Sequence, residues 1–140
     1  MTTTSVEQRN VELTKKGYQA FNEAHIEGVM DVLDDDVVWH IGGENPISGE
    51  YKGKEAVIGM FAKFAQLTEG TYEADVHDIL ASEEHTVVLG TYTATRRGRT
   101  RSARFVDVIH PGSDGKAKEV EIRRSMTTPE PAFVSGNVRG

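Results

Sequence analysis

The chain has 140 residues, no cysteine and a formal net charge of -6. The lack of cysteine excludes disulfide scaffolds, zinc–thiolate sites and cysteine nucleophiles, and the net negative charge argues against nucleic-acid binding. Its length fits one domain. No stretch approaches the ~20 apolar residues of a membrane span, and the first ten residues lack an export signal, so we expect a cytoplasmic protein that binds no membrane.

Three helices are predicted in the first half of the chain. Ser5 is a candidate N-cap for a helix from Val6 to about Asn22, in which apolar residues recur near helical spacing. A shorter helix runs from about Ile26 to Leu33. A third covers Lys54 to Leu67 and has an amphipathic stripe made of Val57, Met60, Phe61, Phe64 and Leu67.

One strand is predicted before the third helix and four after it. Residues 37–41 form the first strand, and residues 42–53 are predicted to be a loop. Four later strands, joined by short turns and therefore antiparallel, are expected at residues 71–80, 85–95, 100–110 and 116–124. This order predicts one α+β domain over residues 1–125, with the helices on one face of the sheet, followed by an irregular arm at 126–140.

Several short stretches resemble the SnoaL-like polyketide cyclase family. In chain order they are AFN at 20–22, DDDVVWH at 34–40, PISGEYKG at 46–53, VHDILA at 76–81, GR at 98–99 and DGK at 114–116. This family belongs to the nuclear-transport-factor-two superfamily, with ketosteroid isomerase and limonene epoxide hydrolase. The resemblance implies a cone-shaped α+β barrel, in which a strongly bent, mainly antiparallel sheet surrounds a cavity and a homodimer forms through the outer sheet face.

The resemblance also indicates Asp107 as a functional acid. Counted from Gly98-Arg99, it falls at the position of the isomerase's protonated aspartate. Alternation along the strand places this acid on an otherwise apolar face with Ala103, Phe105 and Ile109. The alternative is a carboxylate at a sheet edge or dimer interface, paired with Arg104 or Arg123.

Other catalytic positions of the relatives carry different residues here. The isomerase's general base falls near His40 or Ile41, and its catalytic tyrosine falls one position before Tyr18, at Gly17. Limonene epoxide hydrolase uses an Asp-Arg-Asp relay, and the position of one of its aspartates, on the last strand, falls near Ile122. The resemblance therefore supports a pocket more strongly than it supports either mechanism.

Histidines offer further candidate groups. His40 is a candidate base or donor, because imidazole titrates near neutral pH, and a packing histidine is the alternative. A metal site made of His40, His77 and Asp107 has no ligand-spacing motif. We therefore expect neither a metal nor a cofactor.

Aromatic residues are the candidate walls of the pocket, with plain core packing as the alternative for each: Tyr18, Trp39, Tyr51, Phe61, Phe64, Tyr92 and Phe105. The expected partner is a small apolar molecule. The expected activity is cofactor-free acid/base catalysis on a ketone, polyketide or epoxide, with Asp107 and His40 moving the proton. The alternatives are a non-catalytic protein that binds a hydrophobic ligand and a dimerisation module.

Overall fold

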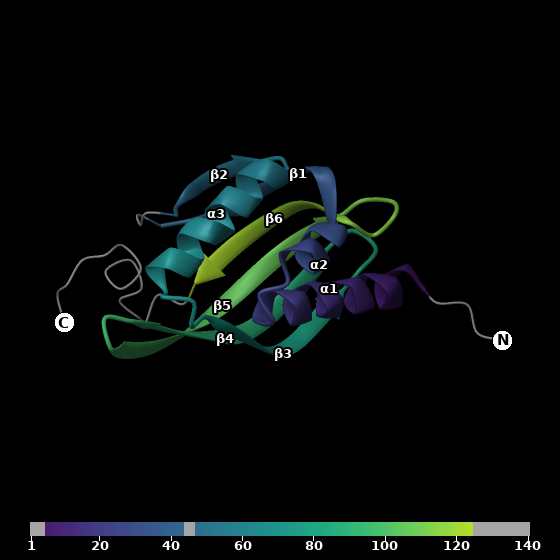
Figure 1. Ribbon diagram of the computed structural model, residues 1–140. Coiled ribbons are helices and arrows are strands. Elements are labelled where there is room, and N and C mark those ends of the chain that lie inside the picture. The colour runs from purple at the N-terminus through teal and green to yellow at the C-terminus, as the bar shows by residue number, and fades with distance from the viewer. Residues whose placement is uncertain (1–4, 44–46, 125–140) are drawn as a thin grey trace.

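A single bent sheet holds three helices against its inner face in the computed structural model, which describes residues 5–43 and 47–124 (Figure 1). The helices are α1 (Val6–Asn22), α2 (Ile26–Asp31) and α3 (Lys54–Leu67). The strands are β1 (Leu33–Ile41), β2 (Gly49–Lys52), β3 (Glu73–Ala81), β4 (Thr86–Arg96), β5 (Arg99–Pro111) and β6 (Ala117–Arg124). The predicted α+β class is confirmed.

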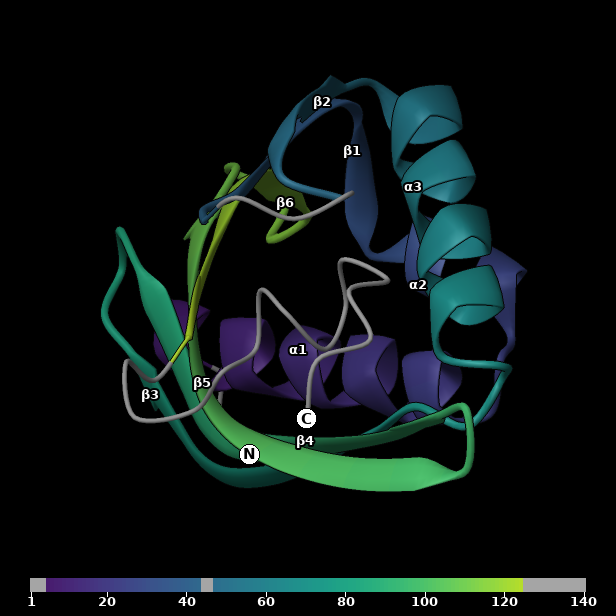
Figure 2. The ribbon, with the colours of Figure 1, turned by 90° about the vertical axis from the view of Figure 1, so that its left-hand side faces the viewer.

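The six described strands lie in the order β2-β1-β6-β5-β4-β3. All neighbours are antiparallel except β1 and β6, which run parallel, so the sheet is mainly antiparallel as predicted. The sheet curls strongly enough that β1 and β2 stand across the interior from β3 and β4, with α3 at one side and α1 running across the view next to β3 and β4 (Figure 2). This curvature creates the concave face on which the candidate site lies.

Local interactions fix α1 at both ends. At its start the side chain of Ser5 accepts from the backbone N–H of Gln8, and the Gln8 side chain accepts from the N–H of Ser5, which is a capping box. At its end, the Asn22 amide donates to the carbonyl of Ala74 at 2.8 Å and accepts from the Ala74 N–H at 2.7 Å. Asn22 thus pairs with β3 as a neighbouring strand would, and it holds α1 against the edge of the sheet.

The structure corrects two predicted boundaries. The second helix ends at Asp31, and the acidic residues 34–36 belong to β1, whose register with β6 shifts between Leu33 and Val38. The predicted loop at 42–53 contains β2, which pairs with β1 from Ile41↔Gly49 to Val38↔Lys52. This strand is short and rich in Gly, Glu and Lys, so it lacks a strand-like composition. The predicted arm at 126–140 lies outside the described residues.

No helix among the described residues is both long and apolar enough to cross a bilayer.

Candidate functional site

A cavity of about 160 Å³ lies between the concave face of the sheet and the helices. Its walls are formed mainly by apolar and aromatic side chains of α1, α3, β1, β5 and β6. Asp107 and Glu73 are the charged residues in this lining, and Glu73 is exposed. Among the residues that the structure describes, no lysine, arginine or histidine lines the cavity. The interior therefore suits a small, largely apolar molecule without negative charge.

Most of the aromatic residues proposed from the sequence lie in the cavity wall: Tyr18, Trp39, Phe61, Phe64, Tyr92 and Phe105. Tyr51 does not line it, and its hydroxyl donates to the carbonyl of Ile47 at 2.7 Å. Burial raises the pKa of the Tyr51 phenol, which therefore stays protonated as a structural donor.

Two aromatic residues of the cavity wall, Phe21 and Tyr72, were not among the predicted wall residues. The ring of Phe21 lies 4.6 Å from that of Tyr72 and 5.8 Å from that of Phe61, which Trp39 contacts edge-on at 5.3 Å. Burial raises the pKa of Tyr72 as well, so its hydroxyl stays a neutral polar group. These rings make one wall of the cavity aromatic, which favours ring-containing ligands.

Asp107 and Tyr18 form the polar centre of the cavity. Asp107 is 6% exposed, and the hydroxyl of Tyr18 donates a hydrogen bond to its Oδ2. The Tyr18 ring stacks on Phe105 at 6.1 Å between centroids. Alternation along β5 turns Asp107 inward, and α1 brings Tyr18 to it from the other side of the cavity. This polar centre is thus a buried carboxylate that accepts a hydrogen bond from a tyrosine hydroxyl.

Of the two arginines suggested as partners of Asp107, Arg104 faces away from it. Arg104 is exposed and lies on the opposite face of β5, because it is an odd number of residues away. The side chain of Arg123 lies outside the described part of the chain.

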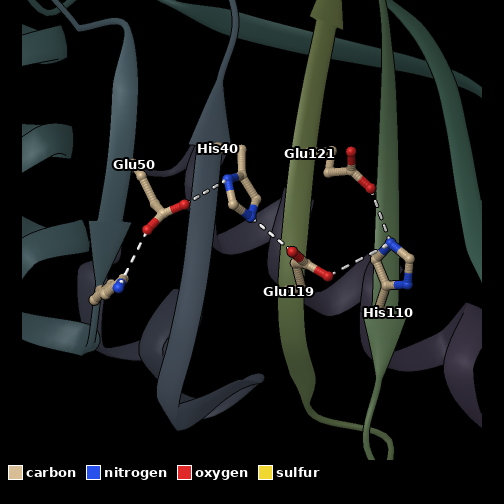
Figure 3. A network of polar contacts seen from close by, with 6 residues as sticks. His40, Glu50, His110, Glu119 and Glu121 are labelled. Atoms are coloured by element: carbon tan, nitrogen blue, oxygen red, sulfur yellow. Dashed lines mark hydrogen bonds and ion pairs between the residues drawn. The ribbon is translucent and has the colours of Figure 1, made fainter.

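His40 lies on the outer face of the sheet, away from the cavity, because it neighbours the inward-facing Trp39 along β1. Its Nε2 is 2.7 Å from a carboxylate oxygen of Glu119, and its Nδ1 is 3.4 Å from one of Glu50 (Figure 3). His110 continues this chain of contacts, with its Nε2 2.9 Å from Glu121. The structure thus separates His40 from Asp107 and does not support a shared catalytic role.

His77 also lies apart from Asp107. It is exposed on β3, where its Nε2 is 3.6 Å from Asp75 and 3.4 Å from the hydroxyl of Thr91. Within residues 5–43 and 47–124, no cluster of three or more histidine, aspartate or glutamate side chains is arranged to hold a metal ion. The geometry gives no support to a metal site at these residues.

Comparison with known proteins places the chain in a family. The model of the SnoaL-like domain matches residues 15–140. The structure of Bal32a from a soil-derived mobile gene cassette is similar at 24% identity and a TM-score of 0.86, over 92% of this chain and 98% of that one. TerC, co-crystallised with polyporic acid, is similar at 25% identity and a TM-score of 0.76, over 83% and 91%.

A putative SnoaL-like polyketide cyclase from Jannaschia sp. CCS1 has only 12% identity but a TM-score of 0.78, and the match covers 100% of this chain and 99% of that one. No protein with curated information matches the sequence. The family model spans most of the chain, and these structures share its fold. The chain belongs to the SnoaL-like domain family.

Proposed function

We propose that this protein binds a small, neutral, ring-containing ketone in its cavity and catalyses a cofactor-free acid/base reaction on it, with Asp107 as the base. The observation that carries this proposal is the buried Asp107 carboxylate, hydrogen-bonded to Tyr18, in an otherwise largely apolar cavity. The polyporic acid in the TerC crystals supports a small organic ligand for this fold.

The proposed reaction begins with proton removal from a carbon next to the ketone carbonyl. Asp107 takes the proton, and the electron pair of the broken C–H bond delocalises onto the carbonyl oxygen as an enolate. Where a neighbouring C=C bond conjugates with the enolate, Asp107 returns the proton to a different carbon and an isomer forms. Where the enolate carbon attacks a second carbonyl of the same molecule, a ring closes and the resulting alkoxide takes the proton back from Asp107. The Tyr18 hydroxyl orients the carboxylate and stabilises its charge before the transfer.

The charge pattern of the cavity supports a neutral ligand over an acidic one. An anionic ligand would meet Asp107 and Glu73, and no cationic side chain among the described lining residues would offset that repulsion. Removing such an anion from water is also unfavourable in an apolar enclosure.

We expect the protein to accelerate exchange of the α-hydrogens of 2-tetralone, a compact neutral ketone, for solvent deuterium. Exchange is followed by proton NMR in D2O, and binding of the same ketone is measured by calorimetry. His40→Ala is the control, because His40 lies outside the cavity, and it should exchange at the wild-type rate. Binding without exchange would contradict the catalytic part of the proposal and favour a ligand-binding protein.

We also propose that two copies of the chain associate through the outer face of the sheet. Val87 pairs with Val108 and Leu89 with Val106 across β4 and β5, and all four side chains are only partly buried on this face. Arg104 lies at one end of this apolar patch and Glu121 toward the other, so an antiparallel copy would bring opposite charges together.

Val106→Lys is expected to convert the dimer to a monomer, because it places a charge at the centre of the apolar patch. Light scattering coupled to size-exclusion chromatography measures the mass. Ile58→Lys is the matched control, because it also replaces a partly exposed apolar side chain with lysine but lies on α3, outside this patch. Ile58 is 39% exposed. A dimer that persists in Val106→Lys, or a wild-type monomer at high concentration, would rule out this interface.

A further inference from the structure

Trp39 brings an unpaired hydrogen-bond donor to the wall of the cavity. It is the one tryptophan of the chain, and it lines the cavity. No described residue accepts a hydrogen bond from its indole N–H, yet this nitrogen is not among the unpartnered polar atoms that the described residues enclose completely. The ring is partly exposed, and alternation along β1 turns it inward. The N–H is therefore accessible from the cavity.

Packing holds the Trp39 ring in a defined orientation. The ring meets that of Phe61 edge-on, with 5.3 Å between the centroids and 87° between the planes. Phe61 lies on α3 and contacts Phe21 of α1 at 5.8 Å, and Phe21 follows Tyr18 by three residues. One wall of rings thus runs from Trp39 to the Tyr18–Asp107 pair. A donor fixed by such packing needs little reorganisation when a ligand reacts.

The strand register places Trp39 and Asp107 within reach of one ring-containing ligand. Asp107 pairs with Ile122 of β6, and Trp39 pairs with Val120, two residues away on the same strand. On a flat sheet, two strand spacings of about 4.8 Å and two residues of about 3.4 Å would separate their Cα atoms by roughly 12 Å. Because the sheet bends around the cavity and both side chains face it, the two side chains converge (Figure 2).

The proposed reaction needs a donor that the Tyr18–Asp107 pair does not supply. As Asp107 removes the proton, negative charge develops on the carbonyl oxygen of the ketone, and a fixed donor at that oxygen stabilises the transition state. The one hydroxyl hydrogen of Tyr18 is already bonded to Asp107. Among the described lining residues, no lysine, arginine or histidine can take this role. The unpaired N–H of Trp39 can.

Tyr72 carries another hydroxyl of the aromatic wall, but it lies farther from Asp107 along the sheet. The residue that follows Tyr72 pairs with Thr93 of β4, whereas Asp107 pairs with Val88 of the same strand. These five residues of β4 correspond to about 17 Å. Tyr72 is therefore less well placed than Trp39 to hold an oxygen whose neighbouring carbon meets Asp107.

We propose that Trp39 is a further catalytic residue, whose indole N–H donates to the carbonyl oxygen of the ketone while Asp107 removes the proton from the adjacent carbon. The hydrogen bond strengthens as this oxygen becomes that of the enolate, so it stabilises the transition state more than the bound ketone. This inference rests on the proposed function and orients its ligand. The carbonyl group lies on the side of β1 and α3, and the reacting C–H bond lies on the side of β5.

The hydrogen bond can be observed in the wild-type protein, because the chain has one tryptophan and therefore one indole signal in a nitrogen–proton NMR spectrum. The probes are 2-tetralone and tetralin, which share the same fused rings, and only the ketone has an acceptor. We expect the indole proton to move to a higher chemical shift with 2-tetralone and to move much less with tetralin. Equal shifts, or no shift with bound ketone, would contradict the inference.

Trp39→Phe removes the N–H and keeps an aromatic ring in the wall. Loss of one donor to a developing oxyanion lowers a rate constant by about 100- to 1,000-fold, whereas loss of a neutral hydrogen bond lowers affinity by about two- to tenfold. We therefore expect the exchange rate of saturating 2-tetralone to fall by the first factor and its affinity, measured by calorimetry, by no more than the second. His40→Ala is the control, because His40 follows Trp39 on β1 and faces outward, and it should keep both values.

Failure of this inference differs from failure of the proposed function. Exchange at the wild-type rate in a folded Trp39→Phe variant, or equal losses of rate and affinity, would exclude the indole as a catalytic donor and leave Asp107 as the base. Loss of exchange in Tyr72→Phe together with wild-type exchange in Trp39→Phe would assign the donor to Tyr72 instead. If the wild-type protein neither binds 2-tetralone nor exchanges its hydrogens, the proposed function fails, and the catalytic role of Trp39 fails with it.

Discussion

Asp107→Asn is expected to slow the enzyme-dependent exchange of 2-tetralone α-hydrogens by about 100- to 10,000-fold, the usual contribution of a positioned acid/base group. An amide accepts no proton under these conditions, so the variant loses the base. The shape of the cavity should be preserved, because the amide oxygen of asparagine still accepts from the hydroxyl of Tyr18. Affinity for the ketone should therefore change far less than the exchange rate.

Two measurements distinguish the loss of the catalytic base from a loss of folding or of ligand binding. Urea unfolding shows whether Asp107→Asn is folded, and calorimetry shows whether it still binds 2-tetralone. Tyr18→Phe removes the hydrogen bond to Asp107 and keeps the ring that stacks on Phe105, so it should lower the rate by a smaller factor. Exchange at the wild-type rate in a folded Asp107→Asn variant would exclude Asp107 as the base.

The sequence predicted most of the fold because its local signals agree with one another. The first helix begins at Ser5 in a capping box, and the apolar stripe of the third helix lies on the buried side of α3. The short turns after α3 produced the antiparallel strands that composition predicted. β2 was missed because its stability comes from pairing with β1, and pairing partners leave no local signal in a strand of four residues.

The candidate site was predictable only in part. Strand alternation predicts which side chains share a face of the sheet, but it does not predict which residues of other elements they contact. Alternation grouped Asp107 with Phe105, and both line the cavity. The same rule separates Trp39 from His40, so the two residues could not both enter one pocket. The contact between Tyr18 and Asp107 joins residues that are far apart in sequence, and a single sequence contains no signal for it.

Asn10 illustrates a different limit. The helical pattern was visible from apolar residues such as Val11 and Phe21, and a polar residue at the start of a helix is typically exposed. Its burial depends on the turn around Gly115, which belongs to the other end of the chain. Only the folded structure brings these segments together.

Gly90→Ala is expected to lower the free energy of unfolding by about 2 kcal/mol, the cost of forcing a methyl group into a packed interior. A Cβ at Gly90 would lie 2.6 Å from the carbonyl oxygen of Asp75 and 2.7 Å from Cζ of Phe105. The first contact is with backbone and has little freedom to relax. It arises at the register shift in β3 between Val76 and Asp78, which is opposite Gly90.

The same substitution should weaken ligand binding, because Phe105 is the flexible partner in the clash. Displacing its ring disturbs the stack with Tyr18, and Tyr18 in turn holds Asp107.

Gly59→Ala is the matched control. It makes the same change within α3, where a Cβ would meet no atom within 4 Å, and it should raise stability by up to about 1 kcal/mol through helix propensity alone. Denaturant unfolding and 2-tetralone calorimetry on both variants measure the two effects. Wild-type stability in Gly90→Ala would mean that β3 moves away from β4 readily. If Gly90→Ala loses the expected stability but binds 2-tetralone with wild-type affinity, the ring of Phe105 does not position the Tyr18–Asp107 pair.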